Sequence, residues 1–152
     1  QRFAMIFSSC SGNTGAALAR RNVGESVKAI NTAFPHWFND NYKKFNDKVD
    51  SLPVDQHMLI ALIAPRPVYT TSATEDLWAD PVGSYISISN AQKVYALYGK
   101  KSGLTPEPPA PDTAIIHSIL GYHNRTGIHD LTPYDWGKFM LFPNYHYGLG
   151  KE

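Results

Sequence analysis

Three short polar stretches hold the residues whose types and order suit catalysis. Cys10 and Ser11 follow an apolar run near the N-terminus, Asp76 follows a β-branched run, and His129 lies beyond a third run. In α/β hydrolases a nucleophile, an acid and a histidine occur in that order; the histidine takes a proton from the nucleophile and the carboxylate orients the histidine. The sequence therefore raises the question of whether these residues form a hydrolytic triad.

The acid and the base each have an ordinary structural alternative. The stretch SATEDLWADP places Asp76 in a loop, and the same residue pattern is also typical of a solvated acidic turn without a catalytic role. The stretch GYHNRTGIHD holds His123 and His129, and His129 is favoured because it lies past a glycine turn, whereas His123 falls in or at the end of a strand. The histidines have no metal-ligand spacing, so we expect no metal site.

The nucleophile is the weakest part of the pattern. A nucleophile elbow reads G-x-S-x-G because glycines relieve crowding at a strained turn. Around Ser11 the sequence is SCSGN and around Cys10 it is SSCSG, so one or both glycines are missing. The chain therefore offers an acid and a base without a convincing nucleophile.

The surrounding pattern predicts a mostly parallel α/β sheet. Short apolar or β-branched runs predict strands over 2–8, 68–72 and 114–123. Helical spacing and caps predict helices over 14–21, 24–34 and 36–47, one from Asp55 to before Pro65, one over 85–98, and one over 132–142 with Thr132 as N-cap. Because ligands gather at the carboxyl ends of parallel strands, the three polar stretches should meet at one edge of the sheet.

Composition excludes several classes of protein. The chain has 152 residues, 43% hydrophobic and 18% charged, a formal net charge of +1 and one cysteine. These values indicate a globular chain without a membrane span or internal disulfides, and we expect neither a membrane nor a nucleic-acid partner. Three parallel strands are few for a sheet that needs cover on both faces, and the first residues already belong to a strand, so we expect further strands upstream.

Four longer stretches resemble a known family. In order along the chain they are RFAMIFSSCSGNTGAALARRNVGESV, INTAFPHWFNDNY, LPVDQHMLIALIAPRPVYTTSATEDLWADPVGSY and GYHNRTGIHDLTPYDWGKFM. Together they resemble the C-terminal half of bacterial glucuronoyl esterases, carbohydrate esterase family 15, whose relatives are often labelled acetyl xylan esterases. The resemblance implies that residues 1–152 are the C-terminal portion of a single α/β-hydrolase catalytic domain, incomplete without upstream strands.

The resemblance also implies roles for particular residues. The family's serine lies in a G-C-S-R-type or G-H-S-R-type motif upstream of this chain, and many members keep a glutamate, the triad acid, where this chain has Cys10. Asp76 matches the acid that other bacterial members take from the later loop, and His129 matches the base. Trp78 matches a tryptophan that contacts the sugar acid, and Glu25 is assigned to substrate binding as well.

These expectations define one main function and three alternatives. The main hypothesis is a serine-type esterase that needs no cofactor and cleaves glucuronate esters of glucuronoxylan. We expect this protein to be secreted or periplasmic, and this chain to supply the acid and the base. The first alternative is another carbohydrate esterase of the same fold, such as an acetyl xylan esterase. The others are a hydrolase that uses Cys10 or Ser11 as nucleophile, and a non-catalytic carbohydrate-binding remnant.

Overall fold

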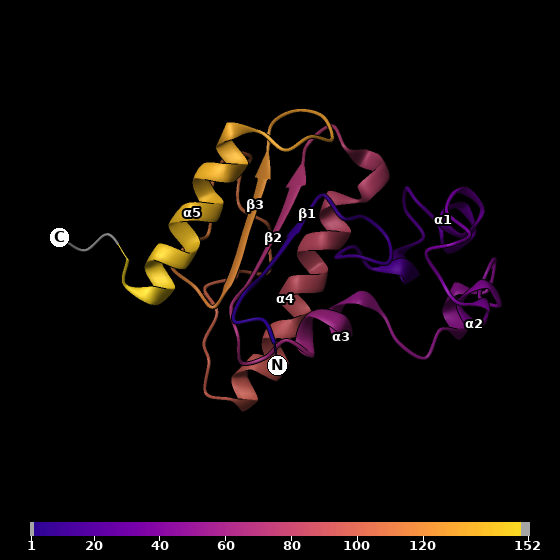
Figure 1. Cartoon of the computed structure of the whole chain (residues 1–152), viewed down its shortest axis with the longest axis horizontal. Helices are drawn as coiled ribbons and strands as arrows, with labels where there is room; N and C mark the ends of the chain where they lie inside the picture. Colours follow the sequence, from indigo (N-terminus) through magenta and orange to yellow (C-terminus); the bar gives the residue numbers. More distant parts are fainter. Residues whose placement is uncertain (1, 150–152) are drawn as a thin grey trace.

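The computed structural model describes residues 2–149, whose strands form one parallel sheet. The strands are β1 (Ile6–Ser9), β2 (Val68–Ala73) and β3 (Leu120–Arg125). They lie side by side in that order, so β2 is central, and it is buried along its whole length. All three point the same way, which brings their carboxyl ends to one edge of the sheet (Figure 1).

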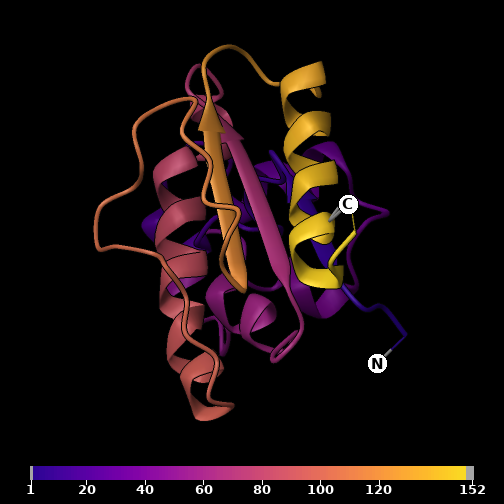
Figure 2. The same cartoon turned by 90° about the vertical axis from the view of Figure 1, so that its left-hand side faces the viewer.

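Helices cover both faces of this sheet. They are α1 (Val27–Ala33), α2 (Asp40–Lys43), α3 (Gln56–Ala61), α4 (Pro81–Leu97) and α5 (Pro133–Tyr147), with 3-10 turns η1 (Ala19–Arg21), η2 (Val49–Ser51) and η3 (Leu77–Ala79). Figure 2 shows α4 and α5 on opposite sides of the strands, and α3 packs against α4. The short helices α1 and α2 lie away from the sheet, beyond α4 (Figure 1).

Alternating side chains of the strands pack on the two helical layers. On the α4 side, the rings of Tyr85 and Tyr122 meet edge to face at 4.9 Å within the main hydrophobic core. On the α5 side, Tyr69 of β2 meets Phe142 at 4.8 Å. Gly121 of β3 lies beneath these two rings, and an added Cβ there would collide with the Tyr69 ring, so this packing requires glycine.

The predicted helix caps are confirmed. Asp55 precedes α3 and accepts the backbone N–H of Gln56 at 2.8 Å, as an N-cap carboxylate does. Thr132 precedes α5, and Asp135 in the first turn accepts its backbone N–H at 2.7 Å, which is the reciprocal bond of a capping box. The helix continues through Pro143 to Tyr147, five residues further than predicted.

The predicted helix over 14–21 is wrong. Thr14 has a φ of 68°, in the left-handed region, and the Ser11 hydroxyl accepts the N–H of Ala16 at 2.9 Å, so this segment forms turns. Only η1 is helical there, and the Asp55 carboxylate accepts the N–H of Ala19 at 2.8 Å from across the chain. The apolar spacing of this segment therefore does not produce a helix, because side-chain oxygens accept the backbone N–H groups that a helix would use.

Two other predicted elements are shorter than expected or displaced. In the segment 36–47 only α2 is α-helical, since Asn39 caps a single turn. The strand predicted over 114–123 instead runs from Leu120 to Arg125, because the chain before it folds back and Ile115 pairs antiparallel with Tyr122. This shift places His123 inside β3.

Candidate active site

The carboxyl edge of the sheet brings the three predicted polar stretches together. The backbone N–H of Cys10, after β1, donates to the carbonyl of Thr71 in β2 at 3.0 Å. The loop after β3 is joined to the loop after β2, because the N–H of Glu75 donates to the carbonyl of Gly127 at 2.9 Å. Gly127 in turn donates its N–H to the Thr74 hydroxyl at 3.1 Å. The loops that carry Asp76 and His129 are therefore bonded to one another.

Asp76 and His129 form a close pair. The Nδ1–H of His129 donates to Oδ2 of Asp76 at 2.7 Å, across 53 positions of sequence. The Asp76 side chain is 7% exposed whereas that of His129 is 68% exposed. Within residues 2–149, Nε2 of His129 has no hydrogen-bond partner. A buried carboxylate thus fixes one nitrogen of an imidazole whose other nitrogen can exchange a proton with a bound group.

His123 lies in a different environment. Its side chain is fully buried; Nδ1 accepts the hydroxyl hydrogen of Tyr69 at 2.9 Å, and Nε2 donates to Oδ1 of Asp135 at 2.8 Å. Burial lowers the pKa of His123 although the Asp135 carboxylate opposes that effect, so the ring is neutral. Both nitrogens are occupied, and His123 does not line the cavity that contains His129. The two histidines therefore differ in environment: both nitrogens of His123 are bonded inside the fold, whereas Nε2 of His129 is not bonded within the described residues.

A cavity of about 510 Å³ opens beside the acid–histidine pair. Glu25 and Trp78 line it together with Asp76 and His129, and the backbone N–H of Glu25 donates to the Trp78 carbonyl at 2.8 Å. Burial raises the pKa of Glu25, while a hydrogen bond from Trp78 opposes that rise. Gly24 has a φ of 67°, and an added Cβ there would collide with the Trp78 carbonyl. All four residues assigned to the site thus surround one cavity.

Two further aromatic residues line this cavity. Trp37 and Phe34 stack with ring centroids 4.0 Å apart and an interplanar angle of 11°, and both line the cavity. Trp37 is 58% exposed. Helix α1 and the turn after it thus stand at the cavity rather than over the strands (Figure 1). No local pattern in the sequence indicates that these two rings line a cavity.

Neither candidate nucleophile of the opening stretch is hydrogen-bonded to His129 within the described part of the chain, although both line its cavity. Cys10 has a φ of 42°, a strained turn of the kind that nucleophile elbows use, but its side chain is buried. Burial and the nearby Asp76 charge raise the pKa of its thiol, against a hydrogen bond with Thr71. The Ser11 hydroxyl is bonded to the Ser8 hydroxyl at 2.7 Å. Their surroundings do not activate either group.

Residues 2–149 contain no cluster of three or more side chains suited to holding a metal ion. They also contain no helix long and apolar enough to cross a bilayer. A parallel α/β sheet with an acid–histidine pair at its carboxyl edge defines a chain of the α/β-hydrolase class.

Comparisons with known proteins identify the family. Residues 1–99 match a family model described as fungal glucuronyl esterase. Carbohydrate esterase MZ0003, from an unknown prokaryotic organism, is 49% identical over 151 residues, which are 99% of this chain and 35% of that protein. The chain belongs to the glucuronoyl esterase family, carbohydrate esterase family 15.

Solved structures agree with this assignment. A promiscuous family 15 esterase from a marine bacterial metagenome superposes with a TM-score of 0.91 at 51% identity, over 95% of this chain and 36% of that one. A glucuronoyl esterase from Solibacter usitatus gives 0.89 at 44%, over 97% and 37%. The chain thus spans about a third of the length of these relatives. The predicted family and fold class are confirmed, and the roles of Asp76, His129, Trp78 and Glu25 stay predictions.

Proposed function

We propose that this chain supplies the general base and its orienting acid to a serine-type carboxylic ester hydrolase that cleaves glucuronate esters. The observation that carries the proposal is the 2.7 Å bond between His129 and the buried Asp76, with Nε2 of the imidazole unbonded within residues 2–149 and His129 lining the cavity. The names of the matching family model and of the Solibacter usitatus relative support an ester of a sugar acid as substrate. The nucleophilic serine is proposed to lie in a part of the protein upstream of this chain.

The chemistry follows from what each group can do with a proton. Nε2 of His129 takes the proton of the serine hydroxyl as its oxygen attacks the ester carbonyl. Asp76 holds the proton on Nδ1, so Nε2 is the basic nitrogen. The negative charge of the Asp76 carboxylate also stabilises the imidazolium that forms. The imidazolium then protonates the departing alcohol, and water, activated in the same way, hydrolyses the acyl-enzyme.

Trp78 and Glu25 are proposed to bind the sugar acid. Both line the cavity beside His129, and Trp78 is 60% exposed, so its ring is open to a ligand. Glu25 accepts hydrogen bonds from sugar hydroxyls when it is ionised. A substrate in the plant cell wall would also require a secreted or periplasmic protein, which is part of this proposal.

The test compares two lengths of the protein on benzyl glucuronate ester. The intact protein, which includes the segment upstream of residue 1, should hydrolyse the ester, and His129→Ala should abolish turnover. Residues 1–152 alone should bind without turnover. If residues 1–152 hydrolyse the ester and His129→Ala abolishes this, the upstream nucleophile is refuted and Cys10 or Ser11 becomes the candidate.

The same proteins, assayed on other carbohydrates, distinguish the two remaining functions from the proposed one. Turnover of acetylated xylan in place of the glucuronate ester would indicate an acetyl xylan esterase. A carbohydrate-binding remnant is favoured by the exposed stack of Phe34 and Trp37 on the cavity wall. It would bind glucuronoxylan oligosaccharides without any turnover by the intact protein, and Trp78→Ala would weaken that binding.

A further inference from the structure

The loop of residues 126–131 carries His129 between the end of β3 and the start of α5. The His129 side chain is 68% exposed and is bonded to Asp76 alone within the described residues. Little packing therefore holds the imidazole, and its place depends on the course of the loop backbone on either side of it.

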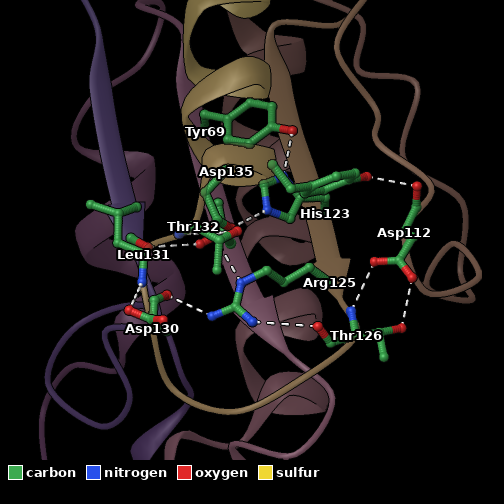
Figure 3. A network of polar contacts seen from close by, with 12 residues as sticks. Tyr69, Asp112, His123, Arg125, Thr126, Asp130, Leu131, Thr132 and Asp135 are labelled. Atoms are coloured by element: carbon green, nitrogen blue, oxygen red, sulfur yellow. Dashed lines mark hydrogen bonds and ion pairs between the residues drawn. The ribbon is translucent and has the colours of Figure 1, made fainter.

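The guanidinium of Arg125, the last residue of β3, reaches along this loop. Its Nη2 donates to the carbonyls of Ile128 and Asp130, each at 2.7 Å, and these residues are the two neighbours of His129 in the chain. Figure 3 shows the guanidinium among the loop residues, with its fork directed at the backbone. One side chain thus bonds the carbonyls of the residues before and after the proposed base.

A buried carboxylate holds this guanidinium in place. Nε of Arg125 donates to Oδ2 of Asp135 at 2.9 Å, and the Asp135 side chain is fully buried (Figure 3). Asp135 also accepts from the backbone and hydroxyl of Thr132, at 2.7 Å each, and from His123. Burial raises the pKa of Asp135, but these hydrogen bonds and the Arg125 charge outweigh burial and lower it, so the carboxylate is charged.

The loop has a second attachment at its start. Thr126 donates its backbone N–H to Asp112 at 2.8 Å and its hydroxyl at 2.6 Å, and Gly127 is bonded to Thr74 and Glu75. These bonds end at residue 127. Within the described residues, the backbone carbonyls of Ile128 and Asp130 are bonded by Arg125 instead.

We infer that Arg125 is a positioning residue for His129, which it keeps in register with Asp76 by bonding both flanking carbonyls. This inference rests on the proposed function. Arginine suits the role because its planar fork donates to Asp135 and to the loop at once, whereas the ammonium group of a lysine is a single point of charge.

The experiment uses the intact protein and benzyl glucuronate ester. Arg125→Lys should lower kcat about 10- to 100-fold, because a displacement of about 1 Å in a catalytic group costs rates of that order, and leave KM within about threefold. Tyr69→Phe is the matched control: it removes a buried hydrogen bond to His123 in the same network but none to the loop, so kcat should stay within about twofold.

A double-mutant cycle excludes a purely structural role. If Arg125 acts by keeping His129 on Asp76, Arg125→Lys should cost much less in an Asp76→Asn background than alone. Equal costs in both backgrounds, or an unchanged kcat, would overturn the positioning role while the proposed function stands. Full turnover by His129→Ala would instead refute the proposed function. If Arg125→Lys does not fold, Arg125→Gln, which keeps one amide donor, is tested with the same expectation.

Discussion

The Asp76→Asn substitution tests the proposed acid most directly. It keeps the size and shape of the side chain but removes its charge. In the unsubstituted protein the Asp76 carboxylate accepts the Nδ1–H of His129 at 2.7 Å. An asparagine that presents its NH2 group to Nδ1 would instead favour the tautomer with the proton on Nε2, which cannot accept a proton from a serine.

The separation and the exposure of the pair set the size of the effect. Two unit charges 2.7 Å apart attract by about 1.5 kcal/mol in water and by about 6 kcal/mol at an effective dielectric constant of 20. Asp76 is buried and His129 is exposed, so the true environment lies between these limits. Since about 1.4 kcal/mol is a factor of ten in rate, loss of this attraction should lower kcat about 10- to 10⁴-fold. The asparagine also favours the unproductive tautomer, so we expect the loss in kcat to be about 10²-fold or more.

The assay measures kcat and KM for benzyl glucuronate ester with the intact protein. The matched control is Glu75→Gln, which removes an exposed charge of the same sign one residue away and should leave kcat within about twofold. Thermal unfolding of each variant separates loss of activity from loss of fold. A kcat of Asp76→Asn within threefold of the parent would refute the assignment of the acid.

Three further measurements concern other parts of the chain. Stability should fall as the pH drops below about 6.5, because burial lowers the pKa of His123 and His146 and the unfolded chain then binds more protons. The His123→Gln substitution should make this fall below about pH 6.5 shallower, and an unchanged unfolding profile would contradict this. Gly24→Ala should destabilise the fold by about 1–3 kcal/mol in urea unfolding and raise KM, because its Cβ displaces the Trp78 carbonyl; an unaltered midpoint would contradict the close approach. Cys10→Ser should keep kcat within about threefold, since burial raises the pKa of the thiol, and fast labelling of Cys10 by iodoacetamide at pH 7 would argue otherwise.

The sequence was sufficient to predict how the site assembles, because topology alone brings distant residues together. Parallel strands end at one edge, so a carboxylate after one strand meets a histidine after the next, and Asp76 and His129 do so. The caps Asp55 and Thr132 were predictable as well, because a side-chain oxygen at a helix start satisfies a donor within a few residues.

Features that depend on distant groups or on backbone strain were not predictable from local patterns. The segment after Cys10 looked helical, but positive φ angles and the bonds to Ser11 and Asp55 fold it into turns. The contribution of Arg125 had no sequence signal of its own, because a side chain that bonds backbone carbonyls leaves no residue pattern. The capping-box spacing of Thr132 and Asp135 was the one visible clue to its carboxylate partner.

The position of the acid also explains why the pair forms within this chain. Asp76 and His129 lie on loops that are bonded to each other through Gly127, whereas Cys10 reaches the sheet through its own bond to Thr71. Within the described residues, the bonds that hold the pair join the loops after β2 and β3 to each other, to Arg125 and to Asp112. One set of bonds therefore places the proposed acid and base together, and the proposed upstream serine is not needed for their geometry.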